Sequence, residues 1–228
     1  MKKTKLIITV LMLGGLWGLL EATLGTLLHL PAIHSIIFFA STAVLLPIAY
    51  LITGYAYKST GYARTAIYVG LVAAAIKSVS FVFGMPVQYV INPMVAIIAE
   101  SLVMAVAFKV AEPKKIISIK SFLTFVVAST AFRIAYVGYS MATASAFGSA
   151  YLVGGSIVWT EVVKYVVTTN AISFIYVVAF MLAGIGISVL SKRPNFAKFT
   201  AKVQHFAYTP VFATVMVCAA VVSTLLLK

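Results

Sequence analysis

The residues of this chain best suited to chemistry are six ionisable side chains inside long apolar stretches. Three of the four acidic residues and three of the 17 basic residues are placed in this way. They are Glu21, Lys77, Glu100, Arg133, Glu161 and Lys164. An ionisable group in hydrocarbon costs about 3 kcal/mol or more at the centre of a helix, so it is usually paired, turned into a bundle interior and functional. Three acids and three cations therefore predict one polar cluster.

The elements that must position these groups are membrane helices. Of the 228 residues, 63% are hydrophobic and 9% are charged, which is typical of a polytopic membrane protein and leaves little length for a soluble domain. Because each span must satisfy its own backbone in lipid, we expect an all-α bundle, multi-pass in the cell membrane. Cys218 is the one cysteine, so neither an intrachain disulfide nor a thiol-based metal site is expected.

Seven apolar segments predict six to seven transmembrane helices. They cover residues 6–29, 33–56, 63–83, 90–110, 118–141, 157–190 and 205–227. The sixth is long, and it either starts as an interfacial helix or is broken near residues 168–170. We expect residues 1–192 to form a six-helix substrate-binding bundle. Residues 193–228 would then add a basic cytoplasmic loop and a further transmembrane helix.

Basic residues predict the orientation of the bundle. They cluster before the first segment and in the connections after the second, fourth and sixth. The opposite connections, near 30–34, 84–90 and 142–156, contain no Lys or Arg. Cytoplasmic loops carry the positive charge, so we expect a cytoplasmic N-terminus. The C-terminus lies outside if the last segment crosses and inside if it lies in the interface. Topology and contact with membrane lipid explain the basic loops, so no nucleic-acid partner is expected.

With this orientation, all six buried charges fall in the middle or outer half of the membrane, which predicts one polar cavity open to the outside. Asn92 lies eight residues before Glu100, on nearly the same helical face. Tyr136 follows Arg133 by three residues. The predicted substrate-binding residues are Glu21, Lys77, Asn92, Glu100, Arg133, Tyr136, Glu161 and Lys164.

Simpler interpretations exist for the charges. Glu161 and Lys164 have i,i+3 spacing and can neutralise each other on one helix. The other four charges could form ion pairs that only hold the bundle together. A bundle with apolar residues at these positions would often be equally stable, so stability alone is a weak reason for the charges and a function is favoured. His29 and His34 are expected to be surface residues rather than metal ligands, because their spacing does not put them on one helical face. No metal or cofactor is expected.

Small residues form a ladder in the first segment. Gly14, Gly18 and Ala22 follow the small-xxx-small spacing that lets another helix approach closely. The ladder serves either packing within the bundle or docking of another membrane subunit. The chain has no Walker motif, no GxGxxG, no HExxH and no Ser/His/Asp set at a plausible depth. We therefore expect no enzymatic activity and no ATP hydrolysis by the chain itself.

The chain resembles the substrate-binding (S) components of energy-coupling factor (ECF) transporters. The resemblance rests on size, hydrophobicity, the basic cytoplasmic face and the ladder of Gly14, Gly18 and Ala22. It implies capture of a vitamin or micronutrient in an outward-facing pocket. It also implies docking of the ladder on a coupling transmembrane subunit and release driven by ATPase subunits. The chain departs from the family pattern in its glycines, where alanine is usual, and in its seventh apolar segment.

Two other functions remain open from the residues alone. In the first, the protein works by itself as a proton- or ion-coupled transporter or channel, with Glu21 and Glu100 as the titrating groups. In the second, it is a membrane enzyme or assembly factor that acts on a lipid or cofactor, which the missing catalytic motif disfavours.

Overall fold

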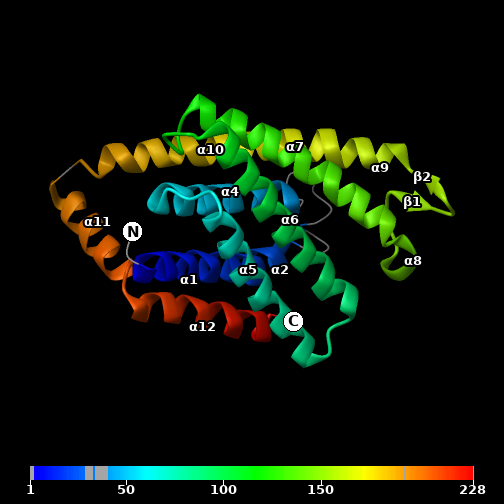
Figure 1. Cartoon of the computed structure of the whole chain (residues 1–228), viewed down its shortest axis with the longest axis horizontal. Coiled ribbons are helices and arrows are strands. Elements are labelled where there is room, and N and C mark those ends of the chain that lie inside the picture. Colours follow the sequence, from blue (N-terminus) through cyan, green and yellow to red (C-terminus); the bar gives the residue numbers. More distant parts are fainter. Residues whose placement is uncertain (1–2, 29–32, 34–40, 193, 228) are drawn as a thin grey trace.

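The structure is a computed structural model that describes residues 3–28, 33, 41–192 and 194–227. Helices make up nearly all of it, and one two-stranded antiparallel hairpin pairs β1 (Leu152–Val153) with β2 (Ser156–Ile157). Figure 1 shows this hairpin and the short helix α8 (Ala144–Phe147) at one end of a bundle of long helices. The start of α1 (Lys3–Leu20) and the whole of α11 (Pro194–Ala207) lie at the other end.

Besides α8, the described residues form eight successive helical elements of this bundle, of which seven correspond to the seven apolar segments and one lies in the connection before the last. Three of them contain a turn of a different helix type, π-helical in η1 and η4 and 3-10 in η3. In chain order the elements are α1 (Lys3–Leu20) with η1 (Glu21–Gly25) and α2 (Thr26–Leu28), α4 (Ser41–Thr60), α5 (Thr65–Ser78) with η3 (Val79–Phe83), α6 (Val87–Ala111), α7 (Ile119–Ala142), α9 (Trp159–Val163) with η4 (Lys164–Thr168) and α10 (Thr169–Leu190), α11 (Pro194–Ala207), and α12 (Pro210–Leu226).

The protein is an all-α, multi-pass membrane bundle, as the composition predicts. Within the described residues, five helices are long and apolar enough to cross a membrane: Lys3–Leu28, Thr65–Val82, Val87–Ala111, Ile119–Ala142 and Trp159–Leu190. A sixth is present if α11 and α12, bent by 76°, count as one span. The helix α4 is not among them. It lies between α1 and α10 in Figure 1 and packs on both, so much of its surface faces protein rather than lipid.

The ladder on α1 packs inside the bundle. A Cβ at Gly14 would lie 2.6 Å from Cβ of Val72, and one at Gly18 would lie 2.8 Å from Cδ1 of Ile76. Both neighbours belong to α5, and Ala22 is also buried. Because α5 covers this face, internal packing is the use that the structure favours, and the ladder is not a free docking surface for a second subunit.

The C-terminal region differs from its prediction in two ways. The expected basic loop after residue 192 is largely the helix α11, whose pattern of apolar and basic residues suits an amphipathic helix. The helix α12 is part of the bundle core rather than an addition to it. A Cβ at Gly15 of α1 would lie 2.9 Å from the backbone nitrogen of Val217, and Ala213 is buried. In Figure 1 α12 runs beside α1 in the same direction, which places the described chain ends at opposite ends of the bundle.

Candidate functional site

Arg133 is the centre of the polar interior. Its side chain is fully buried in α7 and reaches two other helices. On α10, Nε donates to Oδ1 of Asn170 at 3.1 Å, and Nη2 donates to Oγ of Ser173 at 2.6 Å and to the carbonyl oxygen of Thr169 at 3.4 Å. On α4, Nη1 and Nη2 donate to the hydroxyl and carbonyl oxygens of Thr42 at 3.4 and 3.3 Å. These acceptors are neutral, so the guanidinium joins three helices without a direct carboxylate partner among the described residues.

Tyr165 covers one face of the guanidinium. The Arg133 Cζ atom lies 4.9 Å from the centre of the Tyr165 ring, within the range of a cation–π contact. Tyr165 belongs to the π-helical turn η4, where the Thr169 hydroxyl donates to the Lys164 carbonyl oxygen five residues back. Such π turns often occur at functional sites. Here the turn presents an aromatic ring to the buried cation.

Three buried polar side-chain atoms have no hydrogen-bond partner among the described residues, and two of them belong to groups that interact with Arg133. These two are Oε2 of Glu100 and the hydroxyl oxygen of Tyr165, and the third is the Ser80 hydroxyl oxygen. Glu100 is 5% exposed, and its carboxyl interacts electrostatically with Glu21 and Arg133. An unpaired buried polar group costs about 1–3 kcal/mol, more if charged, and such groups normally find a partner in protein, water or ligand. These two atoms are therefore the ones available to form hydrogen bonds with a ligand.

Glu21 and Lys77 extend the cluster toward α5. The indole Nε1 of Trp17 donates to Oε1 of Glu21 at 3.2 Å, and Glu21 begins the other π-helical turn, η1. Lys77, half-buried in the last turn of α5, interacts electrostatically with Glu21. Electrostatic interactions thus link Lys77 to Glu21, Glu21 to Glu100 and Glu100 to Arg133, so these four groups follow one another across four neighbouring elements.

Aromatic side chains extend the cluster from Tyr165 along α7 and into the connection before α9. Ring centres lie 6.1 Å apart for Tyr136 and Tyr165, 5.6 Å for Tyr151 and Tyr165, and 5.8 Å for Tyr136 and Tyr139. The Tyr139 hydroxyl donates to Oδ1 of Asn92 at 2.9 Å, which joins α7 to α6. Burial raises the pKa of Tyr151, in the connection before α9, to about 12, so its hydroxyl remains neutral near pH 7. Tyr136 therefore contacts Tyr165 directly and Asn92 is linked to Tyr136 through Tyr139, while their role in substrate binding stays a prediction.

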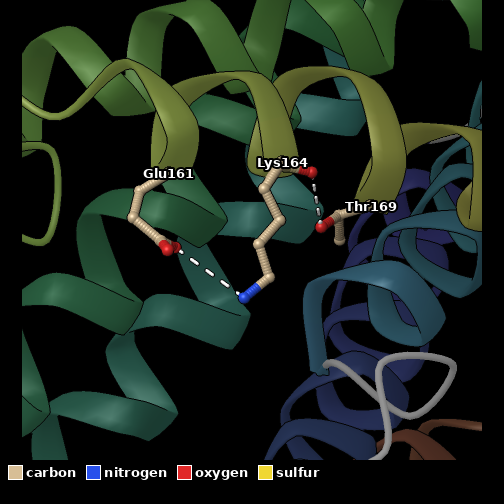
Figure 2. Close-up of polar contacts among 3 residues, drawn as sticks. All are labelled: Glu161, Lys164 and Thr169. Atoms are coloured by element: carbon tan, nitrogen blue, oxygen red, sulfur yellow. Dashed lines mark hydrogen bonds and ion pairs between the residues drawn. The ribbon is translucent and has the colours of Figure 1, made fainter.

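Glu161 and Lys164 do not join this cluster. Their side chains form an ion pair of 3.9 Å between Oε2 and Nζ and are 44% and 57% exposed. Figure 2 shows both leaving the same side of the helix, with Lys164 also accepting the Thr169 hydroxyl through its carbonyl oxygen. The simpler interpretation of local neutralisation therefore describes this pair. We revise its assignment as substrate-binding, because each charge has its partner one turn away on the same helix.

Several residues of the site were missed by sequence reasoning. Tyr165 and Ser173 carried no assignment, Asn170 was noted only as a possible break in the helix, and Thr42 lies in a segment read as plain apolar. A signal exists for two of them: Asn170 and Ser173 are polar, three residues apart, and lie in an otherwise apolar run. Besides binding Arg133, Asn170 donates through Nδ2 to the Thr130 hydroxyl at 2.9 Å.

The histidines of the first outer connection cannot be placed in the site, since His29 and His34 lie outside the described residues. Among the residues that the structure describes, no three His, Cys, Asp or Glu side chains are grouped to hold a metal ion.

Comparison of the chain with models of protein families, with curated proteins and with solved structures finds no match. Functional inference therefore rests on the geometry of the buried cluster.

Proposed function

We propose that this protein captures a small polar molecule inside the membrane, as the substrate-binding subunit of an ECF-type importer of the plasma membrane. The observation that carries the proposal is the pair of buried, unpartnered atoms, Glu100 Oε2 and the Tyr165 hydroxyl, beside the Arg133 guanidinium. A ligand that bonds to both would relieve the cost of burying them. A purely structural ion-pair network would instead be expected to satisfy its own members.

The chemistry of these two unpartnered atoms suggests which functional groups the ligand carries. A carboxylate oxygen accepts hydrogen bonds, so Glu100 suits a cationic or N–H group, while the Tyr165 hydroxyl can donate to a ligand oxygen or nitrogen. The rings of Tyr136, Tyr151 and Tyr165 supply surface for a flat, unsaturated part of the ligand. Lys77 provides a point charge for an anionic group. A zwitterionic, vitamin-like molecule fits this set.

Arg133 was predicted from the sequence as a substrate-binding residue, and the proposal gives it a different role. Its donors are engaged by Thr42, Thr169, Asn170 and Ser173. We therefore assign it as a positioning residue, which fixes Tyr165 through the stacked contact at 4.9 Å and supplies positive potential. The groups that touch the ligand are Glu100, Lys77 and the tyrosines.

Import against a gradient needs an energy source, and the chain has no nucleotide-binding motif. A coupling transmembrane subunit and ATPase subunits would supply it. Because α5 covers Gly14 and Gly18, the coupling subunit would use a different surface from the small-residue ladder.

One observation favours a second candidate, a proton- or ion-coupled transporter that works alone. Glu100 is a buried carboxyl with an unpartnered oxygen, and it interacts electrostatically with a second acid, Glu21. Two neighbouring acids inside a membrane can share one proton and release it when the site opens. This mechanism requires transport by the purified protein without other subunits.

The test begins with mass spectrometry of small molecules retained by the purified protein, followed by binding of the retained compound to Glu100→Gln and Tyr165→Phe. Both changes keep the shape of the side chain. Loss of one hydrogen bond to a charged group, about 1.5–3 kcal/mol, should weaken binding by Glu100→Gln about 10- to 100-fold. Glu161→Gln is the matched control, because its carboxylate belongs to the exposed pair, and it should bind normally.

A second measurement separates the two candidates. Retention of a ligand, co-purification with ATPase subunits and no uptake into liposomes by the protein alone would support the importer subunit. Uptake by the protein alone that follows a proton gradient and is lost in Glu100→Gln would support the coupled transporter. Wild-type affinity in both Glu100→Gln and Tyr165→Phe would refute the assignment of the binding site.

A further inference from the structure

The helix α11 has two chemically different sides. Its apolar residues Phe199, Val203 and Phe206 recur at spacings of four and three, which places them on one face. Lys198 and Lys202 are four residues apart and flank this face. A helix with an apolar face bordered by lysines is the pattern of a helix that lies in the plane of a membrane interface.

The apolar face of α11 is not used for packing within the described structure. Phe199, Val203 and Phe206 are 61%, 48% and 55% exposed. Phe206 contacts the ring of Phe212 at the start of α12, with ring centres 5.2 Å apart, and still leaves more than half of its surface exposed. An exposed strip of this kind indicates a surface that is covered by something outside the chain.

The position of α11 indicates what covers it. The corner between α11 and α12 is held by Tyr208, whose hydroxyl lies 3.0 Å from the Tyr55 hydroxyl and 3.3 Å from that of Ser59. Both partners belong to the last turns of α4, beside Lys58. The corner is thus fixed at the basic end of the bundle, where the helices leave the membrane. From there α11 departs at 76° to α12, so it runs across the bundle end rather than along the spans.

We propose that α11 lies on the cytoplasmic membrane surface and binds anionic phospholipid headgroups. Phe199, Val203 and Phe206 enter the boundary between headgroups and acyl chains. Lys198 and Lys202 extend their alkyl stems over that boundary and place their ammonium groups at lipid phosphates. The contact fixes the depth of the α11–α12 corner, and through α12 it supports the face of α1 around Gly15. This inference is independent of the ligand proposed above.

The test measures the thiol accessibility of α11 in the full chain. Cys218 is replaced by alanine so that an introduced cysteine is unique. Cysteine is then placed at Phe199, on the apolar face, or at Ala201, which lies about 200° further round the helix. Each protein is reconstituted into nanodiscs of phosphatidylcholine, with or without phosphatidylglycerol, and treated with a membrane-impermeant maleimide. We expect F199C to react more slowly than A201C, and the difference to be larger with phosphatidylglycerol.

Lysine variants in the F199C background test the role of charge. A lysine near an anionic surface contributes about fivefold to binding, so Lys198→Gln with Lys202→Gln should raise the reaction rate of F199C up to about 25-fold in anionic nanodiscs. In phosphatidylcholine alone the rate should hardly change. Lys114→Gln with Lys115→Gln is the matched control. It removes two exposed lysines from the connection between α6 and α7 and should leave the rate unchanged.

Three outcomes would overturn the proposal. The first is equal reactivity at positions 199 and 201. The second is protection of F199C that depends neither on phosphatidylglycerol nor on the two lysines. The third is failure of headgroup-labelled nitroxide lipids to quench a fluorophore attached at position 199, which would show that protein rather than lipid covers the face.

Discussion

Replacement of Arg133 by methionine tests how the bundle holds a charge in its interior. Arg133 makes five hydrogen bonds that join α7 to α10 and α4, and it stacks on Tyr165. Methionine keeps the length and flexibility of the side chain but removes every donor. The variant leaves the side chains of Asn170 and Ser173 without this partner in a water-poor interior.

The expected change in the free energy of unfolding follows from the number of hydrogen bonds that Arg133 makes. Hydrogen bonds between membrane helices contribute on average about 0.6 kcal/mol each, so five amount to about 3 kcal/mol. Two of the bonds are 3.4 Å long and weaker, while the stacked ring adds up to about 2 kcal/mol when it is desolvated. Methionine also avoids the cost of burying a charge, which offsets part of the loss. We expect a net decrease of about 2–3 kcal/mol in the free energy of unfolding.

Equilibrium unfolding by sodium dodecyl sulfate in mixed micelles, followed by circular dichroism, measures this change. Arg133→Lys should fall between wild type and Arg133→Met, because an ammonium can replace only part of the planar set of donors. Arg64→Met is the matched control. Arg64 is exposed and stacks on Tyr62 at 5.0 Å without a link between helices, so its loss should cost less than about 0.5 kcal/mol.

The reasoning is refuted if Arg133→Met unfolds like wild type. If that variant also loses the retained small molecule, Arg133 serves the binding site, directly or through Tyr165, and its hydrogen bonds to α10 and α4 are not what stabilises the bundle.

Two further predictions concern packing and the outer ion pair. Gly70→Ala should lower the free energy of unfolding by about 1–3 kcal/mol, because the new Cβ would overlap Ser101 where α5 meets α6. Gly138→Ala is the control and should be tolerated in the same unfolding assay, because nothing lies within 4 Å of a Cβ at that position. Glu161→Gln and Lys164→Gln should each change the free energy of unfolding by less than about 1 kcal/mol, because the pair is partly exposed. Both variants should still retain the ligand. Weaker retention in either variant would show that the pair belongs to the binding site.

The helices could be predicted from sequence because apolar length and basic connections are both strong signals in a membrane protein. The segment expected at 118–141 is the helix Ile119–Ala142, and that expected at 90–110 is Val87–Ala111. The region after residue 192 was harder. The composition of this region, with its lysines and prolines, is typical of a loop. The apolar face of α11 becomes visible only when the residues are placed on a helical wheel.

The depth of the charges was easier to predict than their partners. Counting along each segment places Glu21, Lys77, Glu100 and Arg133 at similar heights, and electrostatic interactions link them in the structure. The rotation of each helix about its axis depends on packing that a single sequence does not reveal. For that reason the sequence predicted Arg133 only as a substrate-binding residue, whereas the structure surrounds its guanidinium with neutral oxygens and a tyrosine ring.

The π-helical turn η4 explains why the faces of the sixth segment were difficult to predict. A π turn adds one residue to a helical turn, so the faces beyond it are shifted by about 100° from an uninterrupted α-helix. Glu161 and Lys164 lie before or at the start of η4, and Asn170 and Ser173 lie after it, so the angle between the two pairs differs from the one that α-helical spacing predicts. In the structure the first pair forms an ion pair, while the second binds Arg133. The turn η1 begins at Glu21 and shifts the faces of the first segment in the same way. The polar site thus depends on local departures from α-helical geometry, which hydropathy does not record.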